Sequence, residues 1–267
     1  GSKLFLLQHG HQYHNKFCNT RYEVRLCDKY FTWGNKIQGK NLVPLYTPTT
    51  IGKKIIKKNA SGILISLILP VLKPNKQLDF PREIETCDIY KKHLFDFLNN
   101  LKKNILEETT IKCYRPANIK KYPNVNFNYI SQDLLGKYNK IKYIEIDKSK
   151  RGFEMSDKYE LLIETANSTG FLESLSMNIP VILVTSKNFF TIQNEYKKFY
   201  NSLIKNNIIF FDSVKAAKFV NTNLNNIDKW WFNKKTQKSI SYFCENMCKR
   251  EINFLKALNL VKKKLTN

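Results

Sequence analysis

The stretch that decides the fold is YELLIETANSTGFLESLSMNIPVILV, residues 159–184. Its pattern predicts a buried strand, a polar turn, a short helix that stops before Pro180, and a second buried strand. A strand, a helix and a further strand in this order form the unit from which parallel sheets are built. We therefore expect an α/β fold around this stretch.

Strand and helix signals alternate on both sides of this stretch, which favours an α/β fold with a mainly parallel sheet flanked by helices. The helical assignments rest on apolar residues that recur every three to four positions. The predicted strands are residues 3–8, 62–69, 110–115, 142–146 and 208–211, and the predicted helices are 89–106, 213–224 and most of the chain from 229 onward.

The alternating pattern breaks over residues 42–55, where the Pro- and Thr-rich run NLVPLYTPTT predicts a domain boundary. Residues 1–45 are too few to form a domain of their own. We expect them to be the tail of a preceding domain whose remainder lies further towards the N-terminus. Residues 46–267 would then form the second domain, with helices at its C-terminal end.

The turn at residues 167–170 places small polar side chains between the predicted strand and helix. Asn167, Ser168 and Thr169 supply hydrogen-bonding groups, and Gly170 lets a ligand approach the backbone closely. The first N–H groups of a helix have no partner inside the helix, and the helix dipole makes this end positive. Because open α/β sheets bind ligands outside the carboxyl ends of their strands, this turn is a candidate anion site.

Glu173 lies about one helical turn further on, where it could accept hydrogen bonds from the two hydroxyls of a ribose. Capping also explains the pattern, because Ser and Thr cap helices and a Glu near the amino end complements the dipole. The segment is not a Walker loop, since no Gly-Lys-Ser/Thr follows, and it is not a G-x-G-x-x-G fingerprint. The residues alone leave both a binding turn and a helix cap open.

The opening segment LFLLQHGHQYH, residues 4–14, ends an apolar run in a polar cluster. His9, His11 and His14 could bind zinc, as in metal-dependent amidohydrolases, but such a site needs further ligands from later strands. Only His93 remains, and it falls inside a predicted helix, so we expect no metal. Since the unperturbed pKa of histidine is about 6.5, His9 suits a general base or a phosphate contact, and an ordinary loop is the alternative.

The chain carries a formal net charge of +23, from 45 Lys and Arg against 22 Asp and Glu. The abundance of Lys, Asn and Ile is typical of AT-rich coding and explains much of this charge. The part of the positive charge that this bias does not explain favours an anionic membrane surface or a phosphate-bearing substrate as a partner. Nucleic acid is an unlikely partner, because the chain has no helix-turn-helix, RNA-recognition or zinc-finger signature.

The six cysteines are dispersed and form no C-x-x-C pair, which indicates reduced thiols in a cytosolic protein. No apolar run approaches the roughly 20 residues that span a bilayer. We expect a cytoplasmic protein, with peripheral attachment to the inner face of the plasma membrane left open.

Four segments resemble a family of bacterial surface-carbohydrate transferases that have the GT-B fold. They occur in that family's order and cover nearly the whole chain. The segments are QHG at residues 8–10, CDKYFTWGN at 27–35, NSTGFLESLSMNIPVIL at 167–183 and DKWWFNKKTQKSISYFCE at 228–245. More distantly, the His-Gly loop and the Ser/Thr turn resemble glycerophosphotransferases of teichoic-acid synthesis, and the turn resembles transferases that use CMP-activated acidic sugars.

The resemblance implies two Rossmann-like domains that face a cleft, with the nucleotide donor in the C-terminal domain. It implies transfer of a sugar from a nucleotide-activated donor to a surface glycan or glycolipid acceptor. The donor is a co-substrate bearing CMP, CDP or UDP, so no cofactor is expected. The residues concerned would be Ser168, Thr169 and Gly170 at the donor phosphates, Asn167 beside them, Glu173 at the ribose, and His9 at the reacting centre.

Two departures from the family pattern bear on these expectations. His11 follows Gly10, where the family often has a second glycine, and the turn is Asn-Ser-Thr-Gly instead of the family's Asn-Ala-Thr-Thr type.

Gln8, Gly10 and His11 are candidates for an active-site loop. Arg115, at the end of a predicted strand, could pair with a phosphate in the same cleft or make a surface ion pair. The alternative functions are glycerophosphate polymer synthesis and a non-catalytic basic module that binds nucleic acid or anionic lipid.

Overall fold

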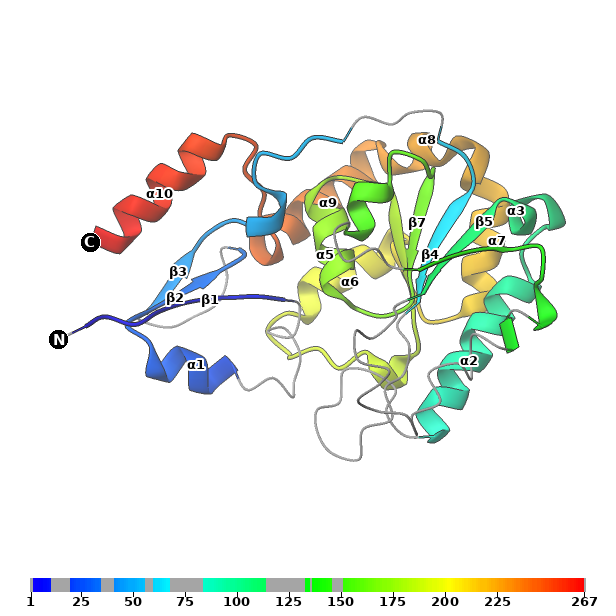
Figure 1. Cartoon of the computed structure of the whole chain (residues 1–267), viewed down its shortest axis with the longest axis horizontal. Coiled ribbons are helices and arrows are strands. Elements are labelled where there is room, and N and C mark those ends of the chain that lie inside the picture. Colours follow the sequence, from blue (N-terminus) through cyan, green and yellow to red (C-terminus); the bar gives the residue numbers. More distant parts are fainter. Residues whose placement is uncertain are drawn as a thin grey trace.

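The computed structural model describes residues 2–10, 20–34, 41–55, 60–67, 84–113, 133–134, 136–145 and 151–266. Its larger part is a six-stranded sheet, in the order β6-β5-β4-β7-β8-β9, with helices on both faces (Figure 1). Every neighbouring pair of strands is parallel, so the predicted α/β fold is confirmed. The strands are β4 (Ile63–Leu67), β5 (Thr109–Cys113), β6 (Lys142–Glu145), β7 (Leu161–Glu164), β8 (Val181–Val184) and β9 (Ile209–Phe210).

The central strands are short runs of buried aliphatic residues, typical of parallel strands that are covered on both faces. Alternate residues point to opposite faces, so Ile63 and Ile65 of β4 join one core cluster and Leu64 joins the other. The first face packs against α2 (Ile84–Asn99) and α7 (Ser213–Asn223), and the second against α5 (Thr169–Ser176), α6 (Lys197–Lys205) and α9 (Lys234–Met247).

Two helical predictions differ in detail from the structure. The helix predicted at residues 89–106 is divided into α2 and α3 (Lys103–Glu107). The division follows from a turn in which the Asn100 N–H donates to the carbonyl of Phe97 at 3.2 Å. The helical tail from residue 229 is α8 (Ile227–Trp231), α9 and α10 (Phe254–Thr266). Asn233 interrupts it because its side chain caps α9, accepting from the Thr236 N–H at 2.8 Å.

The first 44 residues contribute a second, smaller parallel sheet in the order β1-β2-β3. Its strands are β1 (Phe5–Leu7), β2 (Lys29–Thr32) and β3 (Leu42–Pro44), and α1 (Thr20–Leu26) precedes β2. The C-terminal helix α10 packs on this sheet, where Ala257 clusters with Phe31 and Leu45 (Figure 1). The last helix of the chain therefore lies with the small sheet and away from the six-stranded sheet.

Trp33 joins the two sheets. Its side chain is 2% exposed and belongs to the core cluster under α5 and α9. Its carbonyl accepts from the Lys249 N–H at 2.5 Å, just after α9 ends. Gly34 lies so close to α9 that a Cβ there would come within 2.2 Å of the Asn246 backbone. This contact fixes the small sheet against the end of α9.

Within the part of the chain that the structure describes, no helix combines the length and the apolar character needed to cross a bilayer.

Candidate functional site

The polar turn lies where the sheet order changes direction. From β4 the chain runs outward through β5 and β6, and from β7 it runs outward to the other side through β8 and β9. The adjacent ends of β4 and β7 therefore form a topological switch point, where open α/β sheets bind ligands. Thr165, just after β7, donates to the carbonyl of Ser66 on β4 at 2.9 Å and so ties the two strand ends together.

Ser168 is the N-cap of α5. Its backbone is extended, and its hydroxyl accepts a hydrogen bond from the Phe171 N–H at 3.2 Å. The same hydroxyl donates to Oε2 of Glu164 at 3.0 Å. The predicted turn and the predicted cap are thus the same feature, and the amino end of α5 points to the carboxyl edge of the sheet.

Glu164 closes β7 with a carboxylate that lies beneath this turn. A Cβ on Gly170 would lie 3.1 Å from Glu164 Oε1, so the carboxylate occupies the space that the glycine leaves. Burial raises the pKa of the Glu164 carboxyl to about 7, although hydrogen bonds from Ser168 and Ser66 and the positive charge of Lys112 act in the opposite direction. The helix end therefore already faces an ionisable group of the chain itself.

Lys112 is a second buried ionisable group at this edge. It lies on β5, is 5% exposed, and burial lowers its pKa, opposed by Glu164, Glu154 and Glu173. Neither Lys112 nor Glu164 was predicted from the sequence as a site residue. The signal was present, because each is a charged residue near the end of a buried strand: Glu164 follows three aliphatic residues, and Lys112 follows Ile111.

Glu173, predicted to bind a ribose, is 2% exposed and already has partners. Its Oε1 accepts from Thr49 Oγ1 at 2.6 Å and from Arg151 Nη1 at 2.6 Å. Burial raises its pKa, whereas these two partners lower it. The Arg151 side chain remains 47% exposed, so this ion pair brings a cation to the surface beside α5.

Asn167 is held by one end of its amide. Its Nδ2 donates to Tyr200 Oη at 3.2 Å, while Oδ1 is buried with no partner among the described residues. A buried amide oxygen without a donor is uncommon and costs free energy unless water or a ligand supplies one.

The N-terminal loop reaches this turn. A Cβ on Gly10 would lie 3.0 Å from Thr169 Oγ1, so the end of β1 and the start of α5 are in direct proximity. Gln8 is 1% exposed and holds the loop: its Oε1 accepts from the Trp33 N–H at 2.9 Å, and its Nε2 donates to the carbonyl of Gly10 at 3.0 Å. His9 lies between them and is exposed. The structure thus brings residues 8–10 and 167–170 together across more than 150 positions of sequence.

Two predicted site residues, His11 and Arg115, lie outside the described residues, as does His14. Among the residues that are described, no three His, Cys, Asp or Glu side chains gather in a way that could hold a metal ion.

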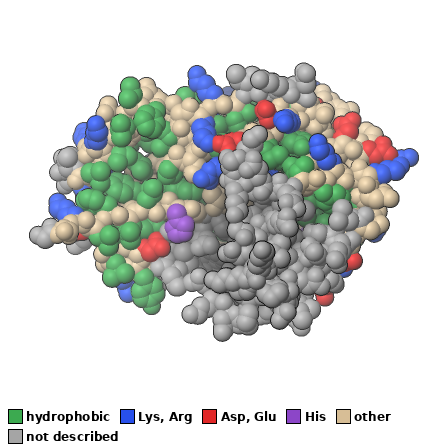
Figure 2. Space-filling view, viewed as in Figure 1, with side chains coloured by type: hydrophobic (Ala, Val, Ile, Leu, Met, Phe, Trp, Pro, Cys, Tyr) green, Lys and Arg blue, Asp and Glu red, His purple; other side chains and the backbone are tan. Residues whose placement is uncertain are grey.

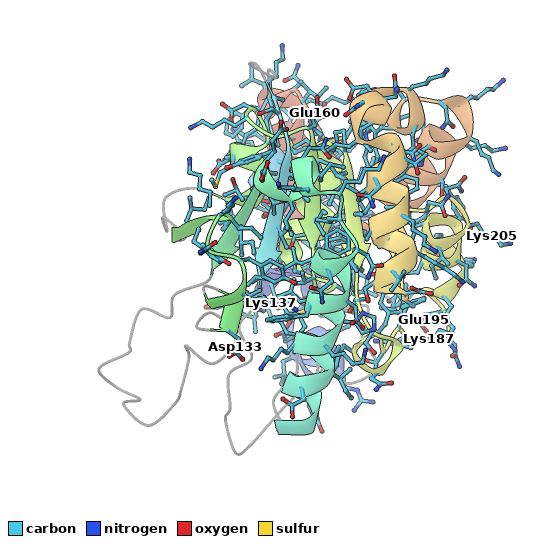
Figure 3. All side chains as sticks on the ribbon, turned by 90° about the vertical axis from the view of Figure 1, so that its right-hand side faces the viewer. Asp133, Lys137, Glu160, Lys187, Glu195 and Lys205 are labelled. Carbon is cyan, nitrogen blue, oxygen red and sulfur yellow. The ribbon has the colours of Figure 1, made fainter. Side chains whose placement is uncertain are left out.

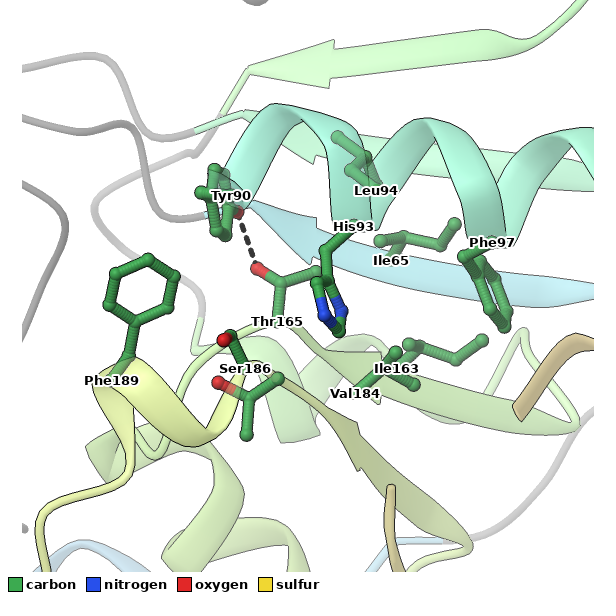
Figure 4. Close-up of a pocket in the computed structure, with 11 residues that line it drawn as sticks. Ile65, Tyr90, His93, Leu94, Phe97, Ile163, Thr165, Val184, Ser186 and Phe189 are labelled. Carbon is green, nitrogen blue, oxygen red and sulfur yellow. Dashed lines mark hydrogen bonds between the residues drawn. The ribbon is translucent and has the colours of Figure 1, made fainter. Parts of the chain in front are cut away.

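A small pocket lies on the other face of the sheet, between α2 and the ends of β4, β7 and β8 (Figure 4). Tyr90 Oη lies 2.6 Å from Thr165 Oγ1 at its mouth. His93 lines the pocket, and burial lowers its pKa, so the imidazole is neutral around pH 7. The predicted helical position of His93 is confirmed, and it faces the apolar side chains of Ile163 and Val184.

Comparison with known proteins places this geometry in context. The sequence matches the LIC12162 family of transferases over residues 1–261. No curated protein matches the chain. Alr3699/HepE from Anabaena, solved in complex with UDP and glucose, is 12% identical with a TM-score of 0.55, over 99% of this chain and 72% of that one. This similarity matches the fold to GT-B glycosyltransferase domains.

Two further structures share less of the fold. WaaG, a glycosyltransferase involved in lipopolysaccharide biosynthesis, is 12% identical with a TM-score of 0.43, over 80% of this chain and 58% of that one. The wall teichoic acid polymerase TagF is 12% identical with a TM-score of 0.40, over 93% of this chain and 60% of that one. The chain therefore spans less than two thirds of the length of both proteins.

Proposed function

Because the chain belongs to the LIC12162 family of transferases, we propose that it transfers a sugar from a nucleotide-activated donor to a bacterial surface glycan. The observation that carries the proposal is the meeting of two loops at the switch point. The amino end of α5 supplies a positive helix terminus, and Gly10 of the opposite loop approaches Thr169 there. A donor phosphate and a reacting group would thereby face each other.

On the donor side, Ser168, Thr169 and Gly170 would bind the phosphates through hydroxyl and backbone N–H groups. Asn167 Oδ1, which has no partner among the described residues, could accept a hydrogen bond from an N–H or O–H group of the nucleotide at the same place. Arg151 is a further candidate, because its half-exposed guanidinium lies beside Glu173 and could form a bidentate contact with phosphate. Arg115 stays a candidate from the sequence alone.

Glu173 would bind the ribose by exchanging one of its present partners. Its Oε1 is already bonded to Thr49 and Arg151, so a ribose hydroxyl would compete with Thr49 while Arg151 turned towards phosphate. In GT-B enzymes generally the helix dipole and the cleft handle the leaving phosphate without an obligatory metal, which agrees with a site made of hydroxyls and N–H groups.

On the acceptor side, His9 would act as the general base for the attacking hydroxyl. It is exposed, and its neighbours Gln8 and Gly10 are held by hydrogen bonds that fix the loop near Thr169. His11 remains a candidate of the same loop.

We further propose that residues 1–45 belong to an acceptor domain that is larger than the small sheet. Parallel sheets are normally covered on both faces by helices, and among the described residues β1 pairs only with β2, at the edge of the small sheet. Figure 2 shows hydrophobic side chains gathered over the small sheet and α10. The exposed apolar side chains here are Leu4, Leu7, Tyr22, Leu26, Ile252, Phe254, Leu255, Leu258 and Leu265. Further chain packed on this surface would cover them.

The net charge of +23 suits an anionic acceptor or an anionic membrane surface at the inner face of the plasma membrane. Exposed lysines such as Lys187 and Lys205 point away from the sheet in Figure 3. A glycolipid acceptor would be held near the same surface.

Titration of the protein with UDP, CDP and CMP, and separately with duplex DNA, tests the proposal. We expect saturable binding of one of these nucleotides at 150 mM salt, and DNA binding only at low salt because it would rest on phosphate charge alone. CDP-glycerol is titrated as a further ligand, and a preference for it over these nucleotides would favour glycerophosphate transfer, with CMP as the leaving group. DNA binding at 150 mM salt without nucleotide binding would establish a basic binding module and end the transferase proposal.

A further inference from the structure

A row of polar side chains crosses the centre of the six-stranded sheet below the α5 turn. Lys112 on β5, Ser66 on β4 and Glu164 on β7 are register partners, with Ser66 paired to both neighbours. Residues in register on adjacent parallel strands point to the same face and lie about 4.8 Å apart along the row. One step earlier in the same register the residues are all isoleucines, Ile111, Ile65 and Ile163, and they point to the opposite face of the sheet.

Two glycines cover this row. A Cβ on Gly152, at the start of the 3-10 turn η4 (Gly152–Met155), would lie 3.8 Å from Glu164 Oε1, 3.9 Å from Lys112 Nζ and 3.9 Å from Ser66 Oγ. A Cβ on Gly170 would lie 3.1 Å from the same Glu164 oxygen. Because both glycines lack side chains, the carboxylate of Glu164, at one end of the row, lies directly beneath the amino end of α5.

Ser168 connects the row to the turn and has only one hydroxyl hydrogen. The free protein uses this hydrogen for Glu164 Oε2, while the hydroxyl oxygen accepts from the Phe171 N–H. An ionised carboxylate can only accept, so Ser168 cannot then donate to a phosphate. A protonated carboxyl can donate to Ser168 instead, and the serine hydrogen becomes available to the ligand.

We propose that Glu164 is a positioning residue that gains a proton when the donor binds and thereby turns the Ser168 hydroxyl hydrogen towards the donor phosphate. This inference rests on the proposed function, because it requires a phosphate at the amino end of α5. The step is a proton transfer from the solvent: a hydronium ion or the acid form of the buffer loses its proton and becomes water or the conjugate base, and an O–H bond forms at Glu164 Oε2. Glu164 then donates to Ser168 Oγ, and Ser168 donates to a phosphate oxygen. No bond to the donor is made or broken.

The charges around Glu164 agree with this exchange. Burial places the pKa of its carboxyl at about 7, so the free protein holds it near the midpoint of titration at neutral pH. The groups that face it are Lys112 from β5, which favours the ionised form, and Glu173 from α5, which favours the protonated form. Glu154 of η4 acts on Lys112, and Arg151 acts on Glu173. A bound phosphate adds negative charge beside Glu164 and so favours protonation further.

Calorimetric titration with UDP and with CDP, in two buffers of different ionisation enthalpy, counts the protons taken up on binding. The matched proteins are the wild type and Glu164→Gln, whose amide cannot titrate and can already donate to Ser168. At pH 8 we expect the wild type to take up close to one proton more than the variant. At pH 6 the two counts should agree, because Glu164 is already protonated. The protons of the nucleotide's own phosphate cancel in this comparison.

The affinity of the wild type provides a second measurement. Its dissociation constant should rise by up to tenfold per pH unit above pH 7, where the nucleotide phosphate is already ionised. The variant should show a weaker dependence. Equal proton counts in two proteins that both bind nucleotide would overturn the role of Glu164 and leave the donor site standing. Absence of nucleotide binding in both would overturn the proposed function, and the coupling with it.

If Glu164→Gln does not fold, the carboxyl titration of Glu164 can be followed in the wild type by ¹³C labelling, with and without UDP. A rise in the Glu164 pKa on adding UDP supports the inference, and an unchanged pKa overturns it.

Discussion

Ser168 serves the helix and the buried carboxylate with a single hydroxyl, which makes it the most informative residue of the site. It caps α5 through Phe171 N–H and donates to Glu164. A residue that only capped the helix would have no need of the second contact. Substitutions here therefore separate a structural role from a binding role.

Changing Ser168→Ala together with Thr169→Ala should weaken nucleotide binding by roughly 1–3 kcal/mol, the range for hydrogen bonds to a charged partner. The protein should remain folded, because a lost cap costs about 1 kcal/mol. Asn233→Ala is the matched control, since it removes the cap of α9 far from the turn. Calorimetric titration measures the affinity. If the folded double variant binds nucleotide as tightly as the wild type, Ser168 and Thr169 are not part of the donor site.

His9→Ala should reduce turnover by about 10²–10⁴-fold in a preparation that transfers sugar, as expected for loss of a general base. Nucleotide affinity should change little, because the imidazole would act on the acceptor. His9→Gln keeps a hydrogen-bonding side chain but cannot exchange protons near neutral pH, so it should be impaired to a similar degree. A variant that loses nucleotide affinity in proportion to turnover would identify His9 as a phosphate contact instead.

Glu164 should make the free energy of unfolding depend on pH. Its folded pKa of about 7 lies above the ordinary value of 4.5, so between these pH values the folded state binds more protons than the unfolded chain. Stability from this group is present below pH 4.5 and is lost as pH rises to about 7, by roughly 3 kcal/mol at most. Denaturant unfolding of the wild type and Glu164→Gln at pH 4.5 and 8 measures the difference. A gap that does not change with pH would show that Glu164 titrates normally.

At the scale of elements, the site depends on how the small sheet is joined to α9. Trp33 makes part of this contact through its buried ring and through its carbonyl, which accepts from the Lys249 N–H. Gly34 makes the rest, because no side chain fits between it and the Asn246 backbone. The same small sheet ends in the loop that reaches Thr169, so the joint also sets the distance between the two halves of the site.

Gly34→Ala should destabilise the protein by about 1–3 kcal/mol or more, since its Cβ would lie 2.2 Å from the Asn246 backbone. Gly136→Ala is the control: nothing among the described residues lies within 4 Å of a Cβ there. It should leave stability unchanged or raise it slightly. Circular dichroism during heating gives the melting temperature of each variant. Equal melting temperatures would mean that the contact between Gly34 and α9 can adjust without loss of stability.

At the scale of the whole molecule, two lobes of unequal size meet where Gly10 approaches Thr169. The small sheet, α1 and α10 form one lobe, and the six-stranded sheet with its helices forms the other (Figure 1). The proposed site would take its helix terminus from the large lobe and its histidine from the small one. The lobes must therefore be held in a defined relation for the site to be complete.

Removal of metal should leave the whole molecule unaffected. The chain has only four histidines, and His93 lies in α2, away from the N-terminal loop, so the ligands for a closed zinc site are too few. Treatment with EDTA should change neither the melting temperature nor the affinity for nucleotide, and a zinc enzyme treated in parallel confirms that chelation worked. Stoichiometric zinc that is lost together with stability would reopen the hydrolase alternative.

Local patterns along the chain were sufficient for the α/β class and for most elements. The strand, turn and helix at residues 159–184 follow from aliphatic runs and from the preference of Ser for the N-cap, both of which act between residues close in sequence. The division between α2 and α3 was missed, because the turn at Asn100 that divides them is held by α7, where Asn221 donates to the Asn100 carbonyl at 2.7 Å and accepts from the Lys102 N–H at 2.8 Å.

The candidate site was predictable only in part. Residues 167–170 are recognisable in the sequence as a polar turn after a buried strand. The row Lys112, Ser66 and Glu164 does not, because its members are far apart in sequence and become neighbours only through strand register. The pKa values of Lys112 and Glu164 are altered by burial, and burial cannot be read from a single position of the sequence.

The sequence by itself therefore determined the class of fold, the position of the helix terminus that can bind an anion, and the basic charge of the molecule. Tertiary structure alone decided that the loop at His9 meets that terminus, that Glu173 is held by Arg151, and that α10 packs on the small sheet. The reason is physical. Short-range hydrogen bonding and side-chain periodicity are encoded within a few residues, whereas burial, register and the approach of distant loops arise only when the whole chain packs.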